Sequence, residues 1–480
     1  MSIIFGTDGW RGLLDSEVNS ETISLVAQAF ADYNNLKFSG PKVAIGYDGR
    51  RYSKRFAEIF AEILSGNGIK VFLSDRVVPT PVISFFVKDN KLNSGVMITA
   101  SHNPPQYNGV KFKANYGGPF LTEDTLNVEN LIGKSSLKKN SDNIERINFI
   151  LPYVTQLEKL IDFEIIRRPR LNILIDSMGG AGADYLERIL LSHYIPAKTI
   201  YSPPDENFYG RLAEPIDKNL EPLKNELIKN DYSIGVATDG DADRLGVMLE
   251  NGEWLSAQET ILLLADYVIN KKYFDGNIVK TSSVTDKLRA LFENERRKVI
   301  DVQVGFKYIT EEMIKSPIAF GCEESGGYGY GNHIPERDGL LSALLMIEMF
   351  AESGYQKLSE FVNHKRKEID LIHYSRIDLA YKKDDRKNKL PDLFNKDLKN
   401  LASFKVNEVI TFQSSRGIIN GIKFILDGDN RWLLIRSSET EPVIRFYAEG
   451  QSDNEIKELL EFGEKLLTEN HSHGSRNPQN

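Results

Sequence analysis

Apolar residues in the first hundred positions follow two alternating patterns, one typical of strands and one typical of helices. Residues 41–48 (PKVAIGYD) form a short apolar run, and residues 53–68 repeat apolar side chains at helical spacing before a glycine-containing end. A strand over 69–75, a helix after Pro81 and a strand ending at Ala100 follow. This β-α-β-α-β order predicts a largely parallel sheet with helical crossovers.

The same order of elements returns twice further along the chain. No visible sequence similarity links the three units, so the repeat is one of topology. After about residue 370 the composition changes to the Lys- and Asp-rich stretch 381–392, and the later strand-like stretch 432–450 indicates a C-terminal domain of different build. The second and third units are predicted from strand-like stretches at 171–176, 232–238, 277–283, 297–304 and 318–322, and from helical stretches at 181–191, at 284–295 and from Gly305 onward.

Composition narrows the class of protein. The 480 residues are 41% hydrophobic and 27% charged, which is ordinary for a globular protein of several domains. The longest apolar runs, such as 340–350, are too short to span a membrane, and no signal sequence opens the chain. A net charge of −8 argues against nucleic acid as a partner, and a single cysteine, Cys322, excludes an internal disulfide framework. We therefore expect a cytoplasmic protein without a membrane or nucleic-acid partner.

Each of the three α/β units ends in an apolar strand that is followed abruptly by polar residues. VMITA precedes SHNPP, IGVAT precedes DGDADR, and IAFGC precedes EESGG. Ligands of parallel α/β sheets bind at the carboxyl ends of strands, where the connecting loops converge. We therefore expect the three loops to face one site.

The loop DGDADR carries carboxylates at alternate positions. Asp239, Asp241 and Asp243 would repel one another without a cation among them, and such oxygen ligands suit Mg²⁺ or Ca²⁺. An EF-hand is excluded because Arg244 stands at the sixth position, where that loop needs glycine, and because strand-like sequences flank the loop. The remaining alternative is a solvated acidic turn, but the adjacent arginine favours a site for both metal and phosphate.

Two further loops each allow two interpretations. In residues 321–332, Glu323 and Ser325 precede a run of glycines, which suits hydroxyl-rich ligands such as sugars but also a plain turn. A dinucleotide-binding motif is disfavoured there because no helix opens in the required place. The loop 436–445 suits phosphate recognition and an exposed polar turn equally well. Its donors are Arg436, Ser437, Ser438, Thr440 and Arg445.

Residues 99–113 (TASHNPPQYNGVKFK) present Ser101 directly after an apolar strand and bring Lys111 soon afterwards. A Ser-His-Asp hydrolase is disfavoured, because adjacent residues on an extended chain, such as Ser101 and His102, point to opposite sides. The local sequence alone favours surface lysines at Lys280 and Lys307 over ligand contacts. At Arg11 it does not exclude a hairpin or tight turn.

Taken together, five motifs resemble those of the α-D-phosphohexomutases, the phosphoglucomutase and phosphomannomutase group. FGTDGWRG, TASHNPPQYNGVK, TDGDADR, CEESGG and RSSETEP occur in the family's order and span the chain. The resemblance implies an α/β fold of four domains around a central cleft, with three related α/β units of mainly parallel, mixed sheets and a C-terminal α+β domain. The implied domains are a phosphoserine-bearing domain over 1–143, a metal-binding domain over 144–255, a sugar-recognition domain over 256–367 and a phosphate-binding domain over 368–480.

The resemblance also implies a role for each motif residue. Ser101 matches the serine that carries a phosphoryl group. Arg11 and Lys111 match basic groups near it, which are candidates for proton transfer and charge neutralisation. The implied ligands of one Mg²⁺ are Ser101, Asp239, Asp241 and Asp243, and the implied substrate-binding residues are His102, Arg244, Lys280, Lys307, Glu323, Ser325, Arg436, Ser438, Thr440 and Arg445.

The activity that the resemblance implies is interconversion of hexose 1-phosphate and hexose 6-phosphate through a hexose 1,6-bisphosphate. The sequence VGFK at 304–307 resembles the glucomutase branch, and Gly327 stands where phosphomannomutases often place His, so glucose is the expected sugar. Glu439 replaces the usual Gly of the phosphate loop, where a carboxylate is unfavourable unless it points away. The alternatives are a phosphomannomutase, a phosphoglucosamine mutase, or a non-catalytic sugar-phosphate-binding protein on the same scaffold.

Overall fold

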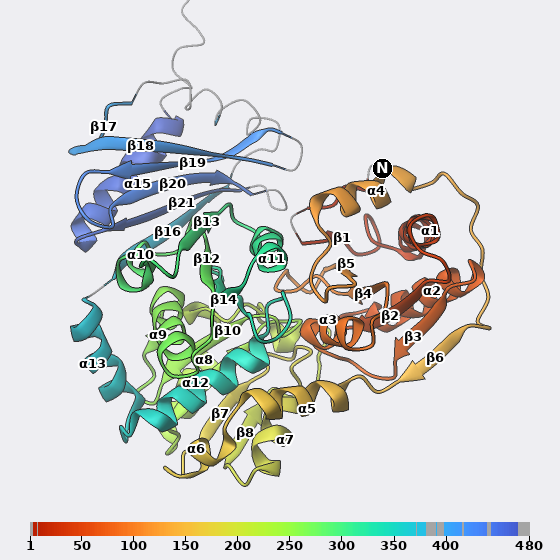
Figure 1. Cartoon of the computed structure of the whole chain (residues 1–480), viewed down its shortest axis with the longest axis horizontal. Coiled ribbons are helices and arrows are strands. Elements are labelled where there is room, and N and C mark those ends of the chain that lie inside the picture. The colour runs from red at the N-terminus through yellow and green to blue at the C-terminus, as the bar shows by residue number, and fades with distance from the viewer. Residues whose placement is uncertain are drawn as a thin grey trace, which may run out of the picture. The chain divides into compact units, whose positions relative to one another are not determined.

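The structure, a computed structural model, is shown in Figure 1. The chain divides into two units, one of residues 1–281 and 297–368 and the other of residues 282–296 and 369–480, and each is described by itself. Within the described ranges no helix combines the length and the apolar character that a membrane span requires. The residues that the structure describes are 3–6, 8–370, 372–380, 390, 398–414, 417–438 and 443–468.

The first sheet of the larger unit has six strands. In chain order its elements are β1 (Trp10–Leu13), α1 (Ser20–Lys37), β2 (Lys42–Tyr47), α2 (Ser53–Gly66), β3 (Lys70–Ser74), α3 (Thr80–Asp89), β4 (Ser94–Ile98), β5 (Tyr107–Ala114), α4 (Thr122–Leu131) and β6 (Ile144–Ile147). The strand order is β1-β5-β4-β2-β3-β6, and β3, β2 and β4 run parallel, as predicted. Helices α1 and α2 pack on this sheet in one core, where the rings of Phe30 and Phe112 stack.

Helix α3 lies close against the same sheet because glycines face it. A Cβ atom on Gly46 would lie 2.5 Å from Ile83 Cγ1, and one on Gly95 would lie 2.7 Å from Val87 Cγ2. This close approach fixes the first residue of α3, Thr80, whose backbone amide donates to the carbonyl oxygen of Asp241 at 2.9 Å. The first sheet is thereby joined to the loop DGDADR, which is the acidic loop of the second sheet.

The second sheet has the order β11-β10-β9-β7-β8 and the third has the order β13-β12-β14-β15. The elements around the second sheet are α5 (Ile150–Leu160), α6 (Phe163–Arg167), β7 (Ile173–Asp176), α7 (Tyr185–Ser192), β8 (Ala197–Ile200), η1 (Phe208–Gly210), η2 (Asp217–Asn219), α8 (Glu221–Lys229), β9 (Ile234–Thr238), β10 (Leu245–Leu249) and β11 (Trp254–Leu255). The elements around the third are α9 (Ala257–Asn270), β12 (Asn277–Thr281), β13 (Val299–Val302), α11 (Phe306–Lys315), β14 (Ile318–Cys322), β15 (Tyr328–Tyr330), α12 (Gly339–Ser353) and α13 (Leu358–Ile369).

All three sheets share one arrangement that the sequence does not predict. In each, one strand of the parallel set is followed by a strand that pairs antiparallel with it: β5 with β4, β10 with β9, and β15 with β14. The three connecting loops are the ones that carry Ser101, the aspartates of residues 239–243, and Glu323. The predicted α/β class with mixed sheets is confirmed, and the motif loops are turns between paired strands.

The smaller unit contains an antiparallel sheet of order β16-β21-β20-β19-β18-β17. Its elements are α10 (Lys287–Phe292), β16 (His373–Ala380), β17 (Asn400–Leu401), β18 (Phe404–Gln413), β19 (Ile419–Leu426), β20 (Trp432–Ser437), β21 (Val443–Gly450) and α15 (Asp453–Thr468). The buried Glu449 carboxylate accepts hydrogen bonds from Trp432 Nε1 and the backbone amide of Asp286, at 2.6 and 3.0 Å. This carboxylate ties the segment 282–296 to the C-terminal sheet. The Lys- and Asp-rich stretch 381–392 lies outside the described residues apart from Leu390.

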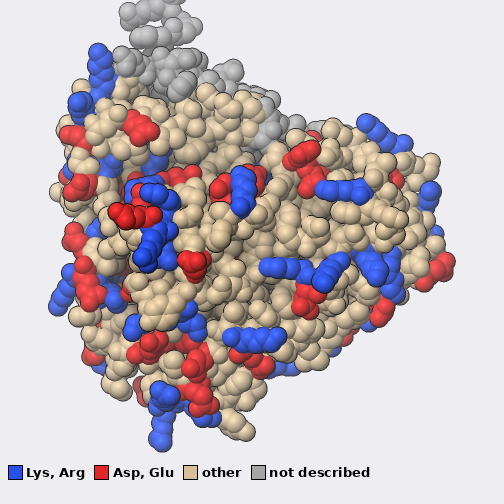
Figure 2. All heavy atoms as spheres, viewed as in Figure 1, with Lys and Arg blue, Asp and Glu red and all other residues tan. Residues whose placement is uncertain are grey.

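On the face that Figure 2 shows, Lys and Arg side chains are interspersed with Asp and Glu side chains. The larger unit also contains buried cations, among them Lys111, Arg244 and Arg337.

Candidate active site

Ser101 is held in an unusual backbone conformation beyond the end of β4. Its φ of 54° lies in the left-handed region, which is unfavourable for a residue other than glycine. Its backbone amide donates to Thr99 Oγ1 at 2.8 Å, and its hydroxyl donates to Asp239 Oδ2 at 3.0 Å. The side chain is fully buried. The chain thus aims this hydroxyl at the acidic loop of the second sheet.

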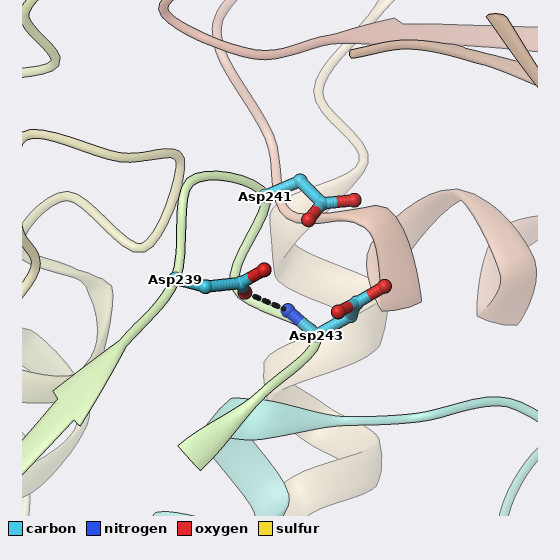
Figure 3. A group of neighbouring side chains, drawn as sticks. All are labelled: Asp239, Asp241 and Asp243. Atoms are coloured by element: carbon cyan, nitrogen blue, oxygen red, sulfur yellow. Dashed lines mark hydrogen bonds between the residues drawn. The ribbon is translucent and has the colours of Figure 1, made fainter. Parts of the chain in front are cut away.

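The acidic loop brings three carboxylates to one point, as Figure 3 shows. One oxygen from each of Asp239, Asp241 and Asp243 lies within 4.8 Å of the others, and all three residues are buried. The backbone amides of Asp243 and Arg244 donate to Asp239 Oδ1 at 3.0 and 3.2 Å and so fix the turn. Gly240 is required here, because a Cβ atom would lie 2.3 Å from the carbonyl oxygen of Ser101.

The donor set of this loop fits a hard divalent cation. Within the described part of the chain, Asp241 Oδ1 and Asp243 Oδ1 are buried and have no hydrogen-bond partner. Buried carboxylate oxygens in that state are unfavourable unless a cation or a donor meets them. Burial, and then the neighbouring carboxylates of Asp243 and Asp241, raise the pKa of Asp239 well above its usual value. Oxygen ligands of this kind suit Mg²⁺ or Ca²⁺.

Lys111, on β5, is the ammonium group of this cluster. Its Nζ lies 2.7 Å from Asp241 Oδ2 and 2.9 Å from both Asp243 Oδ2 and Asp8 Oδ2. Burial opposes the charge, but these carboxylates outweigh it and raise the pKa of Lys111. Burial opposes ionisation of Asp241, but the Lys111 ammonium and the Thr80 hydroxyl outweigh it and lower the pKa of Asp241. Lys111 therefore stays protonated and neutralises the charge of these carboxylates.

Arg337 joins the N-terminal motif, the acidic loop and the third loop through one guanidinium group. It lies 2.8 Å from Asp243 Oδ2 on the acidic loop and 3.3 Å from Glu323 Oε2 on the third loop, and it also pairs with Asp8. Arg11 donates to Asn103 Oδ1 at 2.8 Å and to Asp8 Oδ2 at 3.4 Å. Asp8 therefore connects the N-terminal motif to the rest of the cluster.

The third loop supplies the carboxyl group of Glu323, whose pKa lies near neutral pH. Burial raises the pKa of Glu323 from 4.5 to about 7, even though Arg337 opposes the shift. Arg244 reaches toward the acidic loop, with Nε 3.9 Å from Asp239 Oδ2 and Asp243 Oδ1. Its backbone also bridges to Gly327, so the second and third loops touch. Ser325 lies half-buried in the same loop as Glu323.

The other predicted residues are placed less centrally. Lys280 is buried, with Nζ 2.5 Å from Asp301 Oδ1, and Lys307 is buried in the first turn of α11. His102 is half-buried next to Ser101. In the smaller unit, Arg436 and Arg445 face each other across β20 and β21, and Ser438 is buried. Thr440 and Glu439 lie outside the described residues, and the role of this loop as a phosphate-binding site stays a prediction.

Sequence reasoning missed several members of the cluster. Asp8 and Asn103 lie inside motifs that the sequence singled out, in FGTDGWRG and SHNPP, so a polar residue in a marked loop was the available signal. Thr80, whose hydroxyl donates to Asp241 Oδ2 at 2.5 Å, begins a helix without any such mark. Arg337 and Arg50 sit in PERDG and YDGRR, and nothing local identifies either as a partner of a distant loop.

This arrangement defines a class of protein. A buried hydroxyl faces carboxylates that can hold a divalent cation, and ammonium and guanidinium groups surround them. Phosphoryl transfer depends on this kind of positioning and charge neutralisation. The site is therefore that of a phosphotransferase on an α/β scaffold.

Comparison with known proteins identifies the family. The chain matches the phosphoglucomutase/phosphomannomutase descriptions for alpha/beta/alpha domains I, II and III over residues 2–139, 151–252 and 256–368, and for the C-terminal domain over 385–463. It belongs to the phosphoglucomutase/phosphomannomutase family of the α-D-phosphohexomutases, which are isomerase-type phosphotransferases.

Individual relatives match over nearly the whole chain. A phosphoglucomutase/phosphomannomutase of Thermococcus kodakarensis is 29% identical, covering 98% of this chain and 99% of its own. A phosphoglucosamine mutase of Methanocaldococcus jannaschii is 31% identical over 89% and 92% of the two chains. The crystal structure of a putative phosphomannomutase from Thermus thermophilus superposes with a TM-score of 0.84 at 34% identity, covering 97% of this chain and 99% of that one.

Metal binding by the acidic loop can be tested by removing and restoring the metal. After treatment with EDTA and dialysis, calorimetric titration with Mg²⁺ is expected to show one binding site, and Asp241→Asn should weaken it at least about tenfold, since ligand charge sets the affinity of such sites. Asp15→Asn is the matched control, because Asp15 is exposed and pairs with Arg51 at 3.1 Å. Equal Mg²⁺ affinity in Asp241→Asn and the wild type would exclude this loop as the metal site.

Glu323 predicts a pH-dependent term in stability. The folded protein holds the Glu323 proton up to about pH 7, whereas the unfolded chain releases it near 4.5, so this stabilisation is complete below 4.5 and is lost as pH rises through 7. The Glu323→Gln variant lacks this pH-dependent contribution to stability. The melting temperature of the variant minus that of the wild type should therefore increase from pH 5 to 7 and level off above it. A difference that is flat across this range would show that Glu323 titrates normally.

Proposed function

We propose that the protein interconverts hexose 1-phosphate and hexose 6-phosphate, with glucose as the preferred sugar, and that phosphorylated Ser101 is the phosphoryl carrier. The observation that carries this proposal is the placement of the Ser101 hydroxyl, 3.0 Å from an aspartate of the acidic loop. Lys111 and Arg337 supply positive charge beside that loop. The family is shared with mutases of several sugars, so the sugar is part of the proposal.

The proposed cycle moves one phosphoryl group in each direction. Phosphorylated Ser101 donates to O6 of a hexose 1-phosphate: the bond from phosphorus to Ser101 Oγ breaks, and a bond from phosphorus to O6 forms. The proton that leaves O6 is balanced by the proton that Ser101 Oγ takes up. The hexose 1,6-bisphosphate then turns over. The bond from phosphorus to O1 breaks, a bond from phosphorus to Ser101 Oγ forms, and the proton that leaves Ser101 Oγ is balanced by the proton that O1 takes up. Hexose 6-phosphate is the product.

The side chains of the cluster have different proposed roles. Lys111 stays protonated and suits neutralisation of the transferred group's charge, while Arg11, held by Asn103 and Asp8, is the second cation near Ser101. Asp239, Asp241 and Asp243, with an oxygen of phosphorylated Ser101, would hold Mg²⁺, which when bound withdraws charge from the phosphoryl group. Glu323 and Ser325 are proposed to contact sugar hydroxyls, and the loop at Arg436 and Ser438 to hold the other phosphate.

The geometry at Gly327 supports a sugar loop without an imidazole. A Cβ atom on Gly327 would lie 2.4 Å from Arg337 Cδ, so Arg337 occupies the space that a side chain at this position would need. A side chain at 327, such as the histidine found in phosphomannomutase-type sequences, would require Arg337 to move. The proposed preference for glucose rests on the sequence features VGFK at 304–307 and Gly327.

Replacing Ser101 tests the carrier. Ser101→Ala should lower glucose 1-phosphate to glucose 6-phosphate conversion by at least about a thousandfold, because the nucleophile is removed. Intact-mass analysis after incubation with glucose 1,6-bisphosphate should show one added phosphoryl group on the wild type and none on the variant. Ser177→Ala is the control, since Ser177 is also a buried serine beyond a parallel strand but lies outside the cluster. Undiminished turnover in Ser101→Ala would refute the carrier role.

Substrate profiling tests the sugar. Values of kcat/KM for glucose 1-phosphate, mannose 1-phosphate and glucosamine 1-phosphate should be highest for glucose. A maximum for glucosamine would agree with the names of several relatives and assign the protein to that branch, and a maximum for mannose would show that Gly327 does not set the preference. Phosphate binding without turnover of any of the three would favour the non-catalytic alternative.

A further inference from the structure

Arg50 lies in the turn after β2, and its guanidinium is directed at the backbone of the serine loop. Its side chain is fully buried. Nη2 donates to the carbonyl oxygens of Ser101 and Asn103 at 2.5 and 2.6 Å, and Nη1 donates to those of Pro104 and Tyr107 at 2.9 and 3.1 Å. One side chain therefore holds four carbonyl groups of the loop that carries Ser101.

The surroundings of Arg50 hold the guanidinium in one plane. Its Nε lies 3.3 Å from Asp48 Oδ2, and Asp48 Oδ1 accepts a hydrogen bond from the hydroxyl of Ser53 at 2.6 Å. The ring of Phe208, from the second sheet's region, lies 4.6 Å from the guanidinium carbon. Burial lowers the pKa of Arg50 to about 10, so the group remains charged at neutral pH. A fixed, charged fork of this kind can orient several acceptors at once.

The serine loop needs an external donor. Pro104 and Pro105 have no backbone amide to contribute, and buried carbonyl groups are unfavourable without a hydrogen bond. Ser101 also has a left-handed backbone, which persists only where the surroundings enforce it. Arg50 binds the carbonyl of Ser101 itself, and Gly240 of the acidic loop packs against the same oxygen.

We propose that Arg50 is the positioning residue for Ser101: it fixes the direction of the Ser101 hydroxyl toward the acidic loop by holding the carbonyl groups of residues 101, 103, 104 and 107. This inference rests on the proposed role of Ser101 as phosphoryl carrier. Arg50 acts through the backbone of the loop, because its four hydrogen bonds to that loop are all directed at carbonyl groups. Its loss should therefore affect the transfer step more than the binding of the sugar phosphate.

The test is Arg50→Lys, which keeps the charge but cannot span four carbonyl groups with one ammonium. We expect kcat for glucose 1-phosphate to fall about 10- to 100-fold, the size of effect that a small misplacement of a reacting group produces. KM should stay within about threefold, because the sugar-binding residues are untouched. The rate at which glucose 1,6-bisphosphate phosphorylates Ser101, followed by intact mass, should fall in parallel with kcat.

The matched control is Arg297→Lys. Arg297 also donates to backbone carbonyl groups, those of Gly276 and Phe274, at 2.8 and 3.2 Å, but in the region of the third sheet. Its variant should keep wild-type kcat and Ser101 phosphorylation, whatever its melting temperature. If both variants lose kcat in proportion to their loss of melting temperature, Arg50 is only a structural residue and the proposal is overturned.

Two further measurements keep the outcomes separate. Asp48→Asn leaves Arg50 in place but weakens its ionic partner, and a smaller fall in kcat with unchanged KM is expected there even if Arg50→Lys does not fold. Normal kcat in a folded Arg50→Lys variant overturns the role of Arg50, and so does normal kcat in Asp48→Asn if Arg50→Lys is unfolded. In either case, phosphorylation of wild-type Ser101 leaves the proposed function standing. A wild type that is never phosphorylated on Ser101 overturns both.

Discussion

The burial of several carboxylates at one place is the constraint on which the site depends. Asp8, Asp241 and Asp243 all face the Lys111 ammonium, and Arg337 adds a guanidinium beside two of them. Ionised carboxylates away from water are strongly unfavourable unless cations and hydrogen bonds meet them, and removing one partner of such a group leaves the other uncompensated. The cations of this cluster must therefore be placed accurately, and the packing of the three sheets places them.

Each sheet region supplies charged groups that pair with charged groups from another sheet region. Lys111 from the first sheet meets the aspartates of the second, and Arg337 from the third region meets Asp8 of the first and Asp243 of the second. The antiparallel strands that follow β4, β9 and β14 make this possible, because each motif becomes a loop held at both ends. Backbone contacts, such as the bridge between Arg244 and Gly327, then lock the turns together.

This design explains what the sequence could and could not predict. Strand ends followed by polar residues mark the three loops, since alternation of apolar strands and polar turns is a local property. The ligand set Asp239, Asp241 and Asp243 is local as well. Arg337 is different, because its partners lie in the N-terminal motif, the acidic loop and the third loop, which only the fold brings together. Its own neighbourhood resembles an ordinary turn before a helix.

The same distinction applies to the backbone. The sequence predicted that a strand presents Ser101, but the left-handed conformation of Ser101 and the donors that hold it are tertiary effects. Likewise, the periodicity of residues 284–295 predicts a helix, but the contact of Asp286 with Glu449, far along the chain, is a tertiary effect that it does not predict. Periodicity specifies an element, whereas buried polar partners specify where the element goes.

Charge balance also explains why a metal and a phosphoryl group belong together in the proposed cycle. The carboxylates around Asp243 already engage the neighbouring side-chain cations, so a phosphoryl group on Ser101 would bring negative charge into a site that is rich in it. A divalent cation held by Asp239, Asp241 and Asp243 would offset that charge, and the phosphoryl oxygens would offer the cation a further ligand. In the proposed cycle each would therefore favour the binding of the other.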